Sequence, residues 1–493
     1  MSRTTRLVLP LLASLFVAAP VAAQIPAAEF AARRSALLDS LSDGVVLVLG
    51  GGEPVQDYLP FIQSRPFFYL TGFLEPEAAL VMVKQGGQRR ELIFVRERDA
   101  AREVWNGVRV GTAGARSRLA IDGRDIGQLG GVLDSLLRQH ATIHVLGDLG
   151  GGVHERLPHS QFVDALRASH SGLTVNDAKR TLDRMRSRKS AAELDRLRVA
   201  AEISARGHLA AWRLVQPGVA EFELQAAAEG SWRAEGGDGP SYGSIVGSGP
   251  NSTTLHYNRD DRVAQEGEVI VMDLASYFDG YAADITRTVP VSGRFSPAQR
   301  ELYAIVLAAQ KSAERQVRVG ALGRTMSDSA SAVLATGLAS VGLIDSPSAT
   351  YDCGSATQPR QCSQLSLFYM HGLGHGIGLD VHDPEQYALG GRIDVGSAFT
   401  IEPGIYVRAN LLEVIPWSPR NDALKSRIRS TVEKFANIGV RIEDDYLVTE
   451  QGVVRVTAGV PRELDEVERE LAKPRTPHDA EAVARYLRYK TGR

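Results

Sequence analysis

Long runs of one charge are absent from this chain of 493 residues, whose 56 basic and 58 acidic side chains leave a net charge of −2. Proteins that bind nucleic acid or an anionic membrane surface concentrate positive charge, so neither partner is expected. Nucleotide-binding motifs are also missing, because the glycine runs at 50–52 and 150–152 have no G-x-G-x-x-G or P-loop context. The composition therefore indicates an ordinary globular protein without these partners.

Cysteine is almost absent, since only Cys353 and Cys362 occur, in the segment CGSATQPRQC. In an exported protein this spacing predicts a small loop closed by a disulfide, which would contribute about 2–3 kcal/mol to stability. The alternative is a metal-binding or catalytic pair, but no third ligand lies nearby. The lack of a cysteine near residue 23 also argues against a lipid anchor.

The first 23 residues form the one long apolar segment that requires an explanation. A basic start precedes an apolar run at 7–17 and small residues at 21–23. This pattern is typical of a secretory signal peptide, with cleavage before Gln24 and a periplasmic or secreted product. The alternative is a membrane anchor, but 17 residues interrupted by two prolines are marginal for a membrane span, so no stable anchor is expected.

The length of the chain favours two domains over one hydrophobic core. Residues 24–176 are expected to form a smaller α/β domain, with buried strands and an intervening helix. The strands are predicted at 44–50, 78–84, 91–95 and 142–147, and the helix at 117–140. A charged stretch at 177–198 marks the boundary.

Residues 177–465 are expected to form the larger domain, and a charged tail at 466–493 to carry a surface helix at 479–489. The larger domain has two pairs of amphipathic helices, each followed by strand-like segments. The pairs are predicted at 191–214 with 221–235, and at 297–317 with 326–341. The repeated order suggests an α/β (α+β) architecture with two duplicated halves.

One hairpin in the larger domain brings two carboxylates together. The segment EVIVMDLASYFDGYAADITRTVPV (268–291) has a strong turn signal at Asp279-Gly280. In a hairpin with an even loop, Asp273 and Asp284 lie on the same face, where they would repel unless a cation lies between them. Two solvent-facing aspartates on an edge hairpin are the alternative, but their apolar neighbours favour a metal site.

The segment YMHGLGHGIGLDVHD concentrates three histidines, His371, His375 and His382, among glycines that allow close approach to a ligand. Packing alone does not explain three imidazoles in such a segment. The segment therefore indicates a binding or catalytic role.

Two further acids end strand-like segments. Glu402 precedes Pro-Gly in FTIEPGIY, and Tyr406 shares its strand parity, while Arg441 and Glu443 share one face in NIGVRIEDDY. Together with the two aspartates and one histidine, these acids form a set of four carboxylates and one imidazole. Two divalent cations would cancel its charge of about −4, as in a dinuclear hydrolytic centre.

These segments resemble the pita-bread family of metallopeptidases, and within it aminopeptidase P and prolidase. The matching motifs are PSYGSIVGSG (240–249), LHY (255–257), DITRT (284–288), HGLGHGIGLDVHD (371–383), EPGIY (402–406) and RIEDD (441–445). PFFYLTGF (66–73) and EVWNGVRVG (103–111) resemble the N-terminal domain of such enzymes. The resemblance implies a pita-bread catalytic domain behind a smaller N-terminal domain.

The resemblance also implies the metal ligands: Asp273 would hold one ion, His375 and Glu402 the other, and Asp284 and Glu443 would bridge both. A hydroxide shared by the ions would be the nucleophile. Manganese is expected because the ligand set is rich in carboxylates, with cobalt or zinc as alternatives.

The remaining implied roles concern the substrate, a peptide with proline at its second position. Glu402 would also shuttle a proton, His256 and His382 would bind the scissile carbonyl region, and His371 would line the proline subsite. Arg441 and Tyr406 would support the metal-bound species. Trp105 matches a family position that approaches the active site across a subunit interface, so a homo-oligomer, dimer or tetramer, is expected.

The motifs leave the activity open within one class. An Xaa-Pro aminopeptidase is expected first, and a prolidase that cleaves only Xaa-Pro dipeptides is the nearest alternative. A non-catalytic peptide-binding protein or a metal-free creatinase-like hydrolase is disfavoured, because all five ligands are present. Residues 350–366 and 409–438 resemble insertions, and we expect them to rim the cleft and restrict substrate length.

Overall fold

The computed structural model describes residues 25–54, 56, 60–147, 158–355, 357–385 and 391–491. The expected signal peptide at 1–23 lies outside these residues. Among the helices that they form, none has the length and apolar character needed to cross a membrane.

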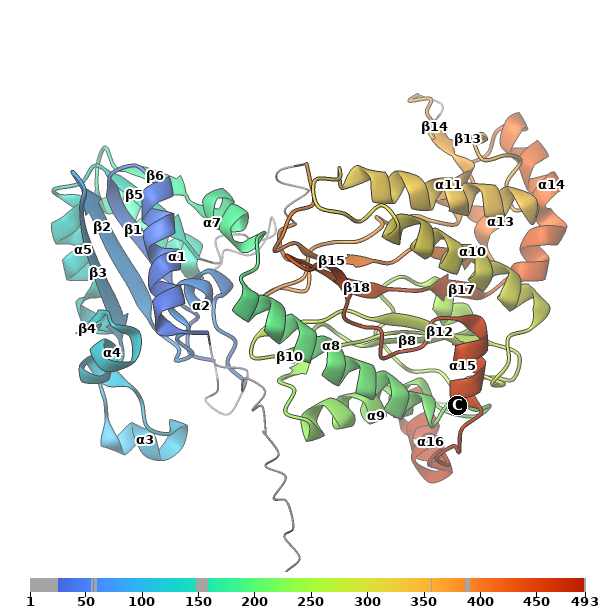
Figure 1. Cartoon of the computed structure of the whole chain (residues 1–493), viewed down its shortest axis with the longest axis horizontal. Coiled ribbons are helices and arrows are strands. Elements are labelled where there is room, and N and C mark those ends of the chain that lie inside the picture. The colour runs from blue at the N-terminus through green and yellow to red at the C-terminus, as the bar shows by residue number, and fades with distance from the viewer. Residues whose placement is uncertain are drawn as a thin grey trace, which may run out of the picture.

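The first domain is built on one mixed, six-stranded sheet (Figure 1). Its strands are β1 (Gly44–Leu49), β2 (Ala79–Gln85), β3 (Gln88–Val95), β4 (Asp122–Asp125), β5 (Thr142–Leu146) and β6 (Thr174–Asp177), in the spatial order β4-β3-β2-β1-β5-β6. Its helices are α1 (Ala27–Ser40), α2 (Arg65–Thr71), α3 (Ala100–Asn106), α4 (Gly111–Leu119), the 3₁₀ turn Ile126–Gln128, α5 (Leu129–Leu137), α6 (Pro158–Ser169) and α7 (Lys179–Arg186). The strands β1, β2 and β3 are antiparallel neighbours, whereas β5 runs parallel to β1.

Both faces of this sheet are buried, which explains the nearly continuous apolar runs of its strands. In β1, Val45 and Leu47 belong to the cluster that contains α5, while Val46 and Val48 belong to the cluster that contains α1. Alternate side chains of a strand point to opposite faces, so each face requires an apolar set. The four predicted strands are confirmed, although β3 begins three residues earlier than expected, at Gln88.

The expected helix at 117–140 is wrong in its middle. The helix α4 ends at Leu119, where Ala120 adopts a left-handed φ of 55°. The short strand β4 follows and pairs in parallel with β3, before α5 begins at Leu129. Backbone pairing with the sheet edge therefore overrides the helical spacing of this segment.

The second domain has two pairs of helices on opposite sides of its strands, as Figure 1 shows. The pairs are α8 (Ala191–Trp212) with α9 (Glu221–Ala234), and α10 (Pro297–Glu314) with α11 (Arg324–Ser340). The strands are β7 (Gly239–Pro240), β8 (Ile245–Ser248), β9 (Val269–Asp273), β10 (Ser276–Phe278), β11 (Tyr281–Ala282), β12 (Thr286–Pro290), β15 (Ala398–Ile401), β16 (Gly404–Val407), β17 (Ile438–Arg441), β18 (Asp444–Thr449) and β19 (Gly452–Arg455), with 3₁₀ segments at Gly249–Thr253 and Gln364–Leu367. All four predicted helices are confirmed within three residues at each end.

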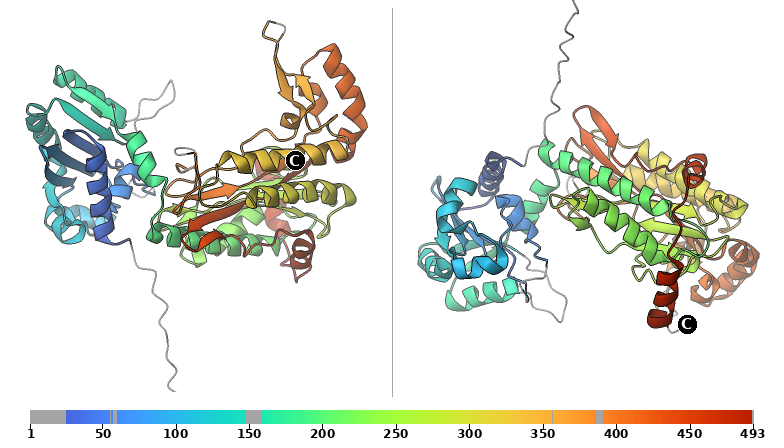
Figure 2. Two further views of the ribbon diagram at one scale, coloured as in Figure 1. Left: turned by 45° about the horizontal axis from the view of Figure 1, so that its top comes forward. Right: turned by 90° about the horizontal axis from the view of Figure 1, so that it is seen from below.

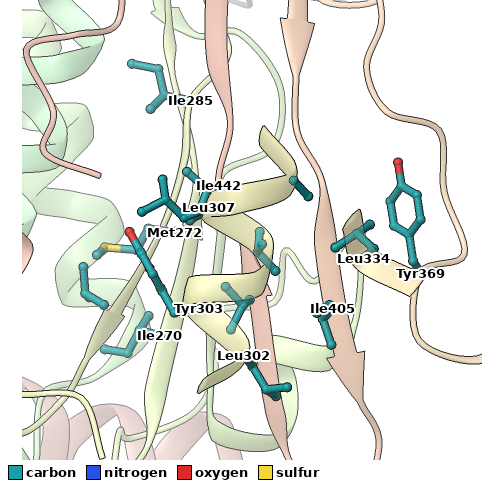
Figure 3. Close-up of a cluster of buried hydrophobic side chains, with 14 of the residues drawn as sticks. Ile270, Met272, Ile285, Leu302, Tyr303, Leu307, Leu334, Tyr369, Ile405 and Ile442 are labelled. Carbon is teal, nitrogen blue, oxygen red and sulfur yellow. The ribbon is translucent and has the colours of Figure 1, made fainter. Parts of the chain in front are cut away.

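Each half of this domain contributes a three-stranded antiparallel sheet, and the first half adds a second one, β11-β10-β7. The sheet β12-β9-β8 belongs to the first half and β15-β18-β19 to the second. The two halves share one hydrophobic core, in which Leu302 and Tyr303 of α10 lie in the same cluster as Ile270 and Met272 of β9 and Ile405 of β16 (Figure 3). This arrangement agrees with the duplicated architecture expected from the sequence.

The two insertions form one unit rather than two separate loops. The first contains the hairpin of β13 (Thr350–Asp352) and β14 (Gln361–Ser363), and the second contains α13 (Leu411–Val414) and α14 (Pro419–Phe435). Asn421 is fully buried between them, where its side chain bonds both the N–H and the carbonyl of Asp352. Figure 2 shows the hairpin projecting beside α14. The predicted disulfide between Cys353 and Cys362 is present within the hairpin.

The predicted domain end at residue 465 is not a structural boundary. The helix α15 (Leu464–Leu471) buries Val467 and Leu471 in the main core of the second domain. The predicted tail helix at 479–489 is observed as α16 (Ala480–Tyr486), which continues as a short π-helical segment at Leu487–Thr491. The tail therefore begins after α15, because the apolar face of that helix is part of the core.

Candidate active site

The predicted hairpin places two aspartates on one face. Asp279 and Gly280 have φ values of 49° and 79°, as a tight turn between twisted strands requires. The register pairs Asp273 with Thr286, so Asp284 lies diagonally across from Asp273. Asp273 is 8% exposed and Asp284 is 5% exposed. Two carboxylates of this hairpin are thus buried side by side, as predicted.

Tyr242 connects these two aspartates, and the sequence had suggested no role for it. Its hydroxyl lies 2.5 Å from Oδ1 of Asp273 and 2.5 Å from Oδ1 of Asp284. One hydroxyl proton can serve only one carboxylate at a time, so the pair has a shortage of positive partners. The only sequence signal was the position of Tyr242 within the motif PSYGSIVGSG, which by itself indicates no ligand contact.

The second half of the domain supplies the remaining predicted ligands. The Nε2 atom of His375 lies 3.4 Å from Asp284 Oδ2 and 3.4 Å from Glu402 Oε1. Its Nδ1 faces the carbonyl of Gly376 at 3.1 Å, which favours the tautomer that leaves Nε2 free to bind a metal. Ligand atoms of Asp284, His375 and Glu443 lie within 4.8 Å of one another. These three residues can therefore surround one ion.

The electrostatics of the cluster indicate that it is built for a cation. Burial raises the pKa of Glu402 to about 8 and the pKa values of Asp273 and Glu443 above their ordinary range. Burial alone would lower the pKa of His375, but Asp284 and Glu402 raise it to about 10. Without a metal, the cluster must bind protons to reduce its repulsion.

Glu443 provides the most direct test of this interpretation. Its Oε2 accepts a hydrogen bond from Thr286 at 2.7 Å, whereas its Oε1 is buried and has no hydrogen-bond partner among the described residues. An unpartnered carboxylate oxygen in the interior is costly unless a cation occupies the neighbouring space. The residues present therefore fit a divalent metal.

Arg441 links the metal cluster to the histidines. Its guanidinium donates to Asp273 Oδ2 at 2.5 Å and to the Tyr406 hydroxyl at 3.0 Å. The same hydroxyl lies 2.9 Å from Nε2 of His371. Tyr406 is fully buried and is not among the described residues that line the cavity. Its hydroxyl instead holds Arg441 and His371, which do reach the cavity wall.

The other nine predicted site residues line one cavity of about 510 Å³. These are His256, Asp273, Asp284, His371, His375, His382, Glu402, Arg441 and Glu443. The rings of His375 and His382 are 4.0 Å apart at their centroids, so a group bound to one would lie beside the other. Tyr242, Ile245, Leu255, Asn258 and Val381 also line the cavity, which combines polar ligands with an apolar wall.

Comparison with known proteins identifies the family. Residues 195–450, more than half of the chain, match metallopeptidase family M24, and residues 30–145 match the aminopeptidase P N-terminal domain. The chain belongs to metallopeptidase family M24. Among its relatives, the Xaa-Pro aminopeptidase of Haemophilus influenzae is 32% identical over 456 residues, covering 90% of this chain and 97% of the relative. Xaa-Pro aminopeptidase of Escherichia coli is 31% identical over 458 residues, covering 90% and 98%.

Solved structures of this M24 subgroup support the same assignment. Aminopeptidase P from E. coli with the inhibitor Pro-Leu aligns with a TM-score of 0.77 and 30% identity, covering 92% of this chain and 99% of that one. A zinc-substituted form of the E. coli enzyme in complex with product gives the same TM-score and identity, covering 92% and 100%. The pita-bread fold and the aminopeptidase P-type N-terminal domain expected from the sequence are therefore confirmed.

The insertions of this M24 chain do not form the wall of the cavity. Among the described residues, none from 350–366 or 409–438 lines it. That they rim the cleft and restrict substrate length stays a prediction. The buried face of α14 packs Leu424, Ile428 and Val432 into the main core.

An ion cluster that sequence reasoning missed holds the histidine segment of this M24 chain. Asp383, directly after His382, accepts hydrogen bonds from Lys189 at 2.8 Å and from Arg186. Arg186 ends α7 and also donates to Asp380 at 2.6 Å. The carbonyl of Gly376 accepts from the backbone N–H of Asp383, which ties the two histidine-bearing stretches together. The connection between the two domains thus fixes the loop behind His375 and His382.

Proposed function

We propose that this chain is an Xaa-Pro aminopeptidase that hydrolyses the bond between an N-terminal residue and a following proline, with two divalent metal ions. The convergence of four carboxylates and one imidazole on one cavity carries the proposal. The relatives named Xaa-Pro aminopeptidase, which match both domains over most of their length, support it. A prolidase with the same site is the alternative.

Asp273, Asp284, His375, Glu402 and Glu443 would hold the ions. When bound, the ions would acidify a water molecule and polarise the scissile carbonyl. Manganese is the proposed ion because the set contains four hard carboxylates and a single imidazole. Cobalt and zinc are alternatives, and a relative from E. coli has been obtained in a zinc-substituted form.

The protein's own groups would manage protons and charge around the peptide. Glu402, which lines the cavity beside His375, would take a proton from the attacking water and deliver it to the proline nitrogen that leaves. Burial lowers the pKa of His382, so its neutral ring can donate one hydrogen bond to the carbonyl oxygen as negative charge develops there. His256, which also lines the cavity, would support the same oxygen.

His371 and Arg441 would orient the substrate without taking part in proton transfer. Burial lowers the pKa of His371 to about 4, so its ring is neutral, and the Tyr406 hydroxyl fixes its orientation. Arg441 cannot lose its proton in the working pH range, so it keeps a positive charge beside Asp273. Both residues thus present a fixed wall to the proline ring and its neighbours.

The substrate class can be tested with two peptides and a metal measurement. Purified protein would be assayed against an Xaa-Pro dipeptide and an Xaa-Pro-Xaa tripeptide, and its metals determined by elemental analysis. We expect both peptides to be cleaved and about two ions per chain. Cleavage of the dipeptide alone would support the prolidase alternative, and protein that binds no metal and cleaves neither peptide would refute the proposal.

We also propose that the protein is exported. The expected leader at 1–23 supports this, and so does the disulfide between Cys353 and Cys362, because disulfides persist in oxidising compartments. Mass spectrometry of protein recovered outside the cytoplasm should give a chain that begins at Gln24. Recovery of a full-length, cytoplasmic chain would contradict export.

The proposed assembly is a dimer or tetramer. The helix α3 and its following turn expose three apolar side chains: Val104 and Trp105 are 78% exposed and Val108 is 74% exposed. Exposed apolar groups clustered in this way are typical of protein contacts. Light scattering of the wild type and of W105A should show a larger particle for the wild type, whereas a monomeric wild type would refute assembly.

A further inference from the structure

One buried histidine outside the cavity contacts the backbone of both aspartate-bearing strands. His208 belongs to α8 and is fully buried. Its Nε2 lies 3.0 Å from the carbonyl oxygen of Leu274 and 3.1 Å from that of Ile285. These residues directly follow Asp273 and Asp284 in the chain. A single side chain therefore contacts the carbonyl of the residue that follows each aspartate.

The hairpin ladder is incomplete at this position. The register of β9 and β12 places Leu274 opposite Ile285, where two residues of a regular antiparallel ladder exchange two hydrogen bonds. The N–H of Leu274 donates to the carbonyl of Ile285 at 3.1 Å, but the reciprocal bond is not formed between these two described residues. His208 supplies the donor that the carbonyl of Leu274 lacks.

The protonation state of His208 follows from its partners. Two carbonyl oxygens face Nε2, so this nitrogen must carry the hydrogen. Nδ1 is buried without a hydrogen-bond partner, and burial lowers the pKa of the ring to about 4. The neutral ring can therefore donate to the backbone without adding a positive charge beneath the carboxylates.

The helix that carries His208 is held rigidly against the hairpin. One turn earlier, Ser204 Oγ accepts the N–H of Ser276 at 2.9 Å. Gly207, beside His208, allows α8 to approach Trp232 of α9 so closely that a Cβ would lie 1.9 Å from the indole nitrogen. A substitution at His208 would therefore change the donor while the position of the helix is kept.

We propose that His208 is a positioning residue that sets the separation of Asp273 and Asp284, and through it the affinity for the metal ions. The inference rests on the proposed metal site. Without the shared donor, the two strands can separate or slide next to Asp273 and Asp284. The distance between the two carboxylates would then vary, and the ligands would no longer be held at one geometry. The effect reaches the metals through the backbone, since His208 does not line the cavity.

Three substitutions at this position separate the effect of the hydrogen-bond donor from the effect of side-chain shape. H208Q keeps an amide donor near the position of Nε2. H208N has a shorter side chain, whose amide cannot reach both carbonyls, and H208L removes the donor. The matched control is S204A, which deletes a hydrogen bond from the same helix to the same hairpin, but at Ser276, beyond the ligands.

The primary readout is the dissociation constant for Mn²⁺ of metal-stripped protein, measured by competition with a chelating dye. The melting temperature in EDTA is recorded for each variant. We expect H208L and H208N to bind Mn²⁺ about 10-fold or more weakly. H208Q and S204A should stay within a few-fold of the wild type. If H208L does not fold, the comparison of H208N with H208Q carries the test.

Each other outcome has a defined meaning. If H208L or H208N melts earlier but binds Mn²⁺ as the wild type does, His208 only stabilises the fold and the inference is overturned. Equal losses of affinity in H208Q or in S204A would also overturn it, because the donor at this position would then be irrelevant. A wild type that binds no Mn²⁺ would refute the proposed function instead.

Discussion

Glu402 has two tasks in the proposed site, since it would hold a metal ion and move a proton. Its Oε1 lies 3.4 Å from His375 Nε2, and its side chain lines the cavity. Replacing Glu402 with Gln keeps the shape but removes the proton carrier and one negative charge. We expect kcat to fall by at least about 100-fold, as measured on an Xaa-Pro-Xaa tripeptide.

The control for this variant is E413Q, an exposed glutamate on α13. It should retain wild-type kcat, because it lies away from the cavity. A Glu402→Gln protein that loses no more than about threefold in kcat would show that Glu402 carries no proton.

Asp260 gives a pH dependence that is separate from the metal ligands. Its Oδ1 accepts the N–H of Val246 at 3.0 Å, while its Oδ2 is buried without a hydrogen-bond partner. Burial, with the nearby Glu221 and Glu229, raises its pKa from 3.8 to about 7. The folded state thus binds this proton more tightly than the unfolded state, and the resulting stability is lost as pH rises from about 4 to about 7.

The variant D260N should remove this loss, because the amide keeps the acceptor for Val246 and never ionises. We expect D260N to melt a few degrees above the wild type at pH 8, with a smaller difference or a reversed one at pH 5. Thermal unfolding of both proteins at the two pH values measures this. The same difference at both pH values would contradict the role of the buried proton.

At the scale of elements, the connection between the domains supports the histidine segment. Lys189 is 1% exposed and Asp383 is 2% exposed at their side chains, and their ion pair lies directly behind His382. Removing Lys189 leaves the buried carboxylate of Asp383 with Arg186 as its remaining cationic partner, so its charge is less well compensated. We expect K189M to lower the free energy of unfolding by roughly 3 kcal/mol. It should also raise KM for an Xaa-Pro-Xaa tripeptide, because His382 loses its support.

The neighbouring R188M provides the control, since Arg188 is 58% exposed at its side chain and pairs with Asp394 at the surface. Urea unfolding and steady-state kinetics of both variants test the prediction. Equal effects in K189M and R188M would show that burial of the ion pair is unimportant.

The helices and strands that follow local sequence patterns are those that could be predicted from the sequence. The hairpin of Asp273 and Asp284 depends on local alternation and on a two-residue turn, so spacing alone predicted their shared face. The paired helices followed their apolar periodicity for the same reason. The edge strand β4 was missed because sheet pairing overrides a weak local preference. Local pattern therefore determines most of the fold, and tertiary pairing determines the exceptions.

The features that could not be predicted depend on contacts between residues far apart in the sequence. Lys189 reaches Asp383 across 194 positions and His208 reaches Leu274 across 66, and no periodicity links such pairs. Tyr242 was missed for the same reason, and the shared strand parity of Glu402 and Tyr406 fixed a strand face but not the depth of either side chain. Residue chemistry thus pointed to the proposed ligands, whereas the groups that orient them required the folded chain.

At the scale of the whole molecule, the ligands join the two halves of the catalytic domain. Asp273 and Asp284 come from the first half, and His375, Glu402 and Glu443 from the second. Ions held between them would cross-link the halves and neutralise carboxylates that otherwise repel. Metal binding should therefore stabilise the folded state against the unfolded one, by about 2.7 kcal/mol when free metal is 100 times its dissociation constant.

Removing the metal should lower the melting temperature of the catalytic domain by several degrees, and added Mn²⁺ should restore it. The first domain has a core of its own in the cluster of β1, β5 and α5, so its melting temperature should change less on metal removal than that of the catalytic domain. Calorimetry of the intact chain with EDTA and with Mn²⁺ would measure both responses. E443Q supplies the control, because it removes an oxygen that has no protein partner, and its melting temperature should be nearly independent of metal. A wild type that melts identically in EDTA and Mn²⁺ would show that ions do not join the halves.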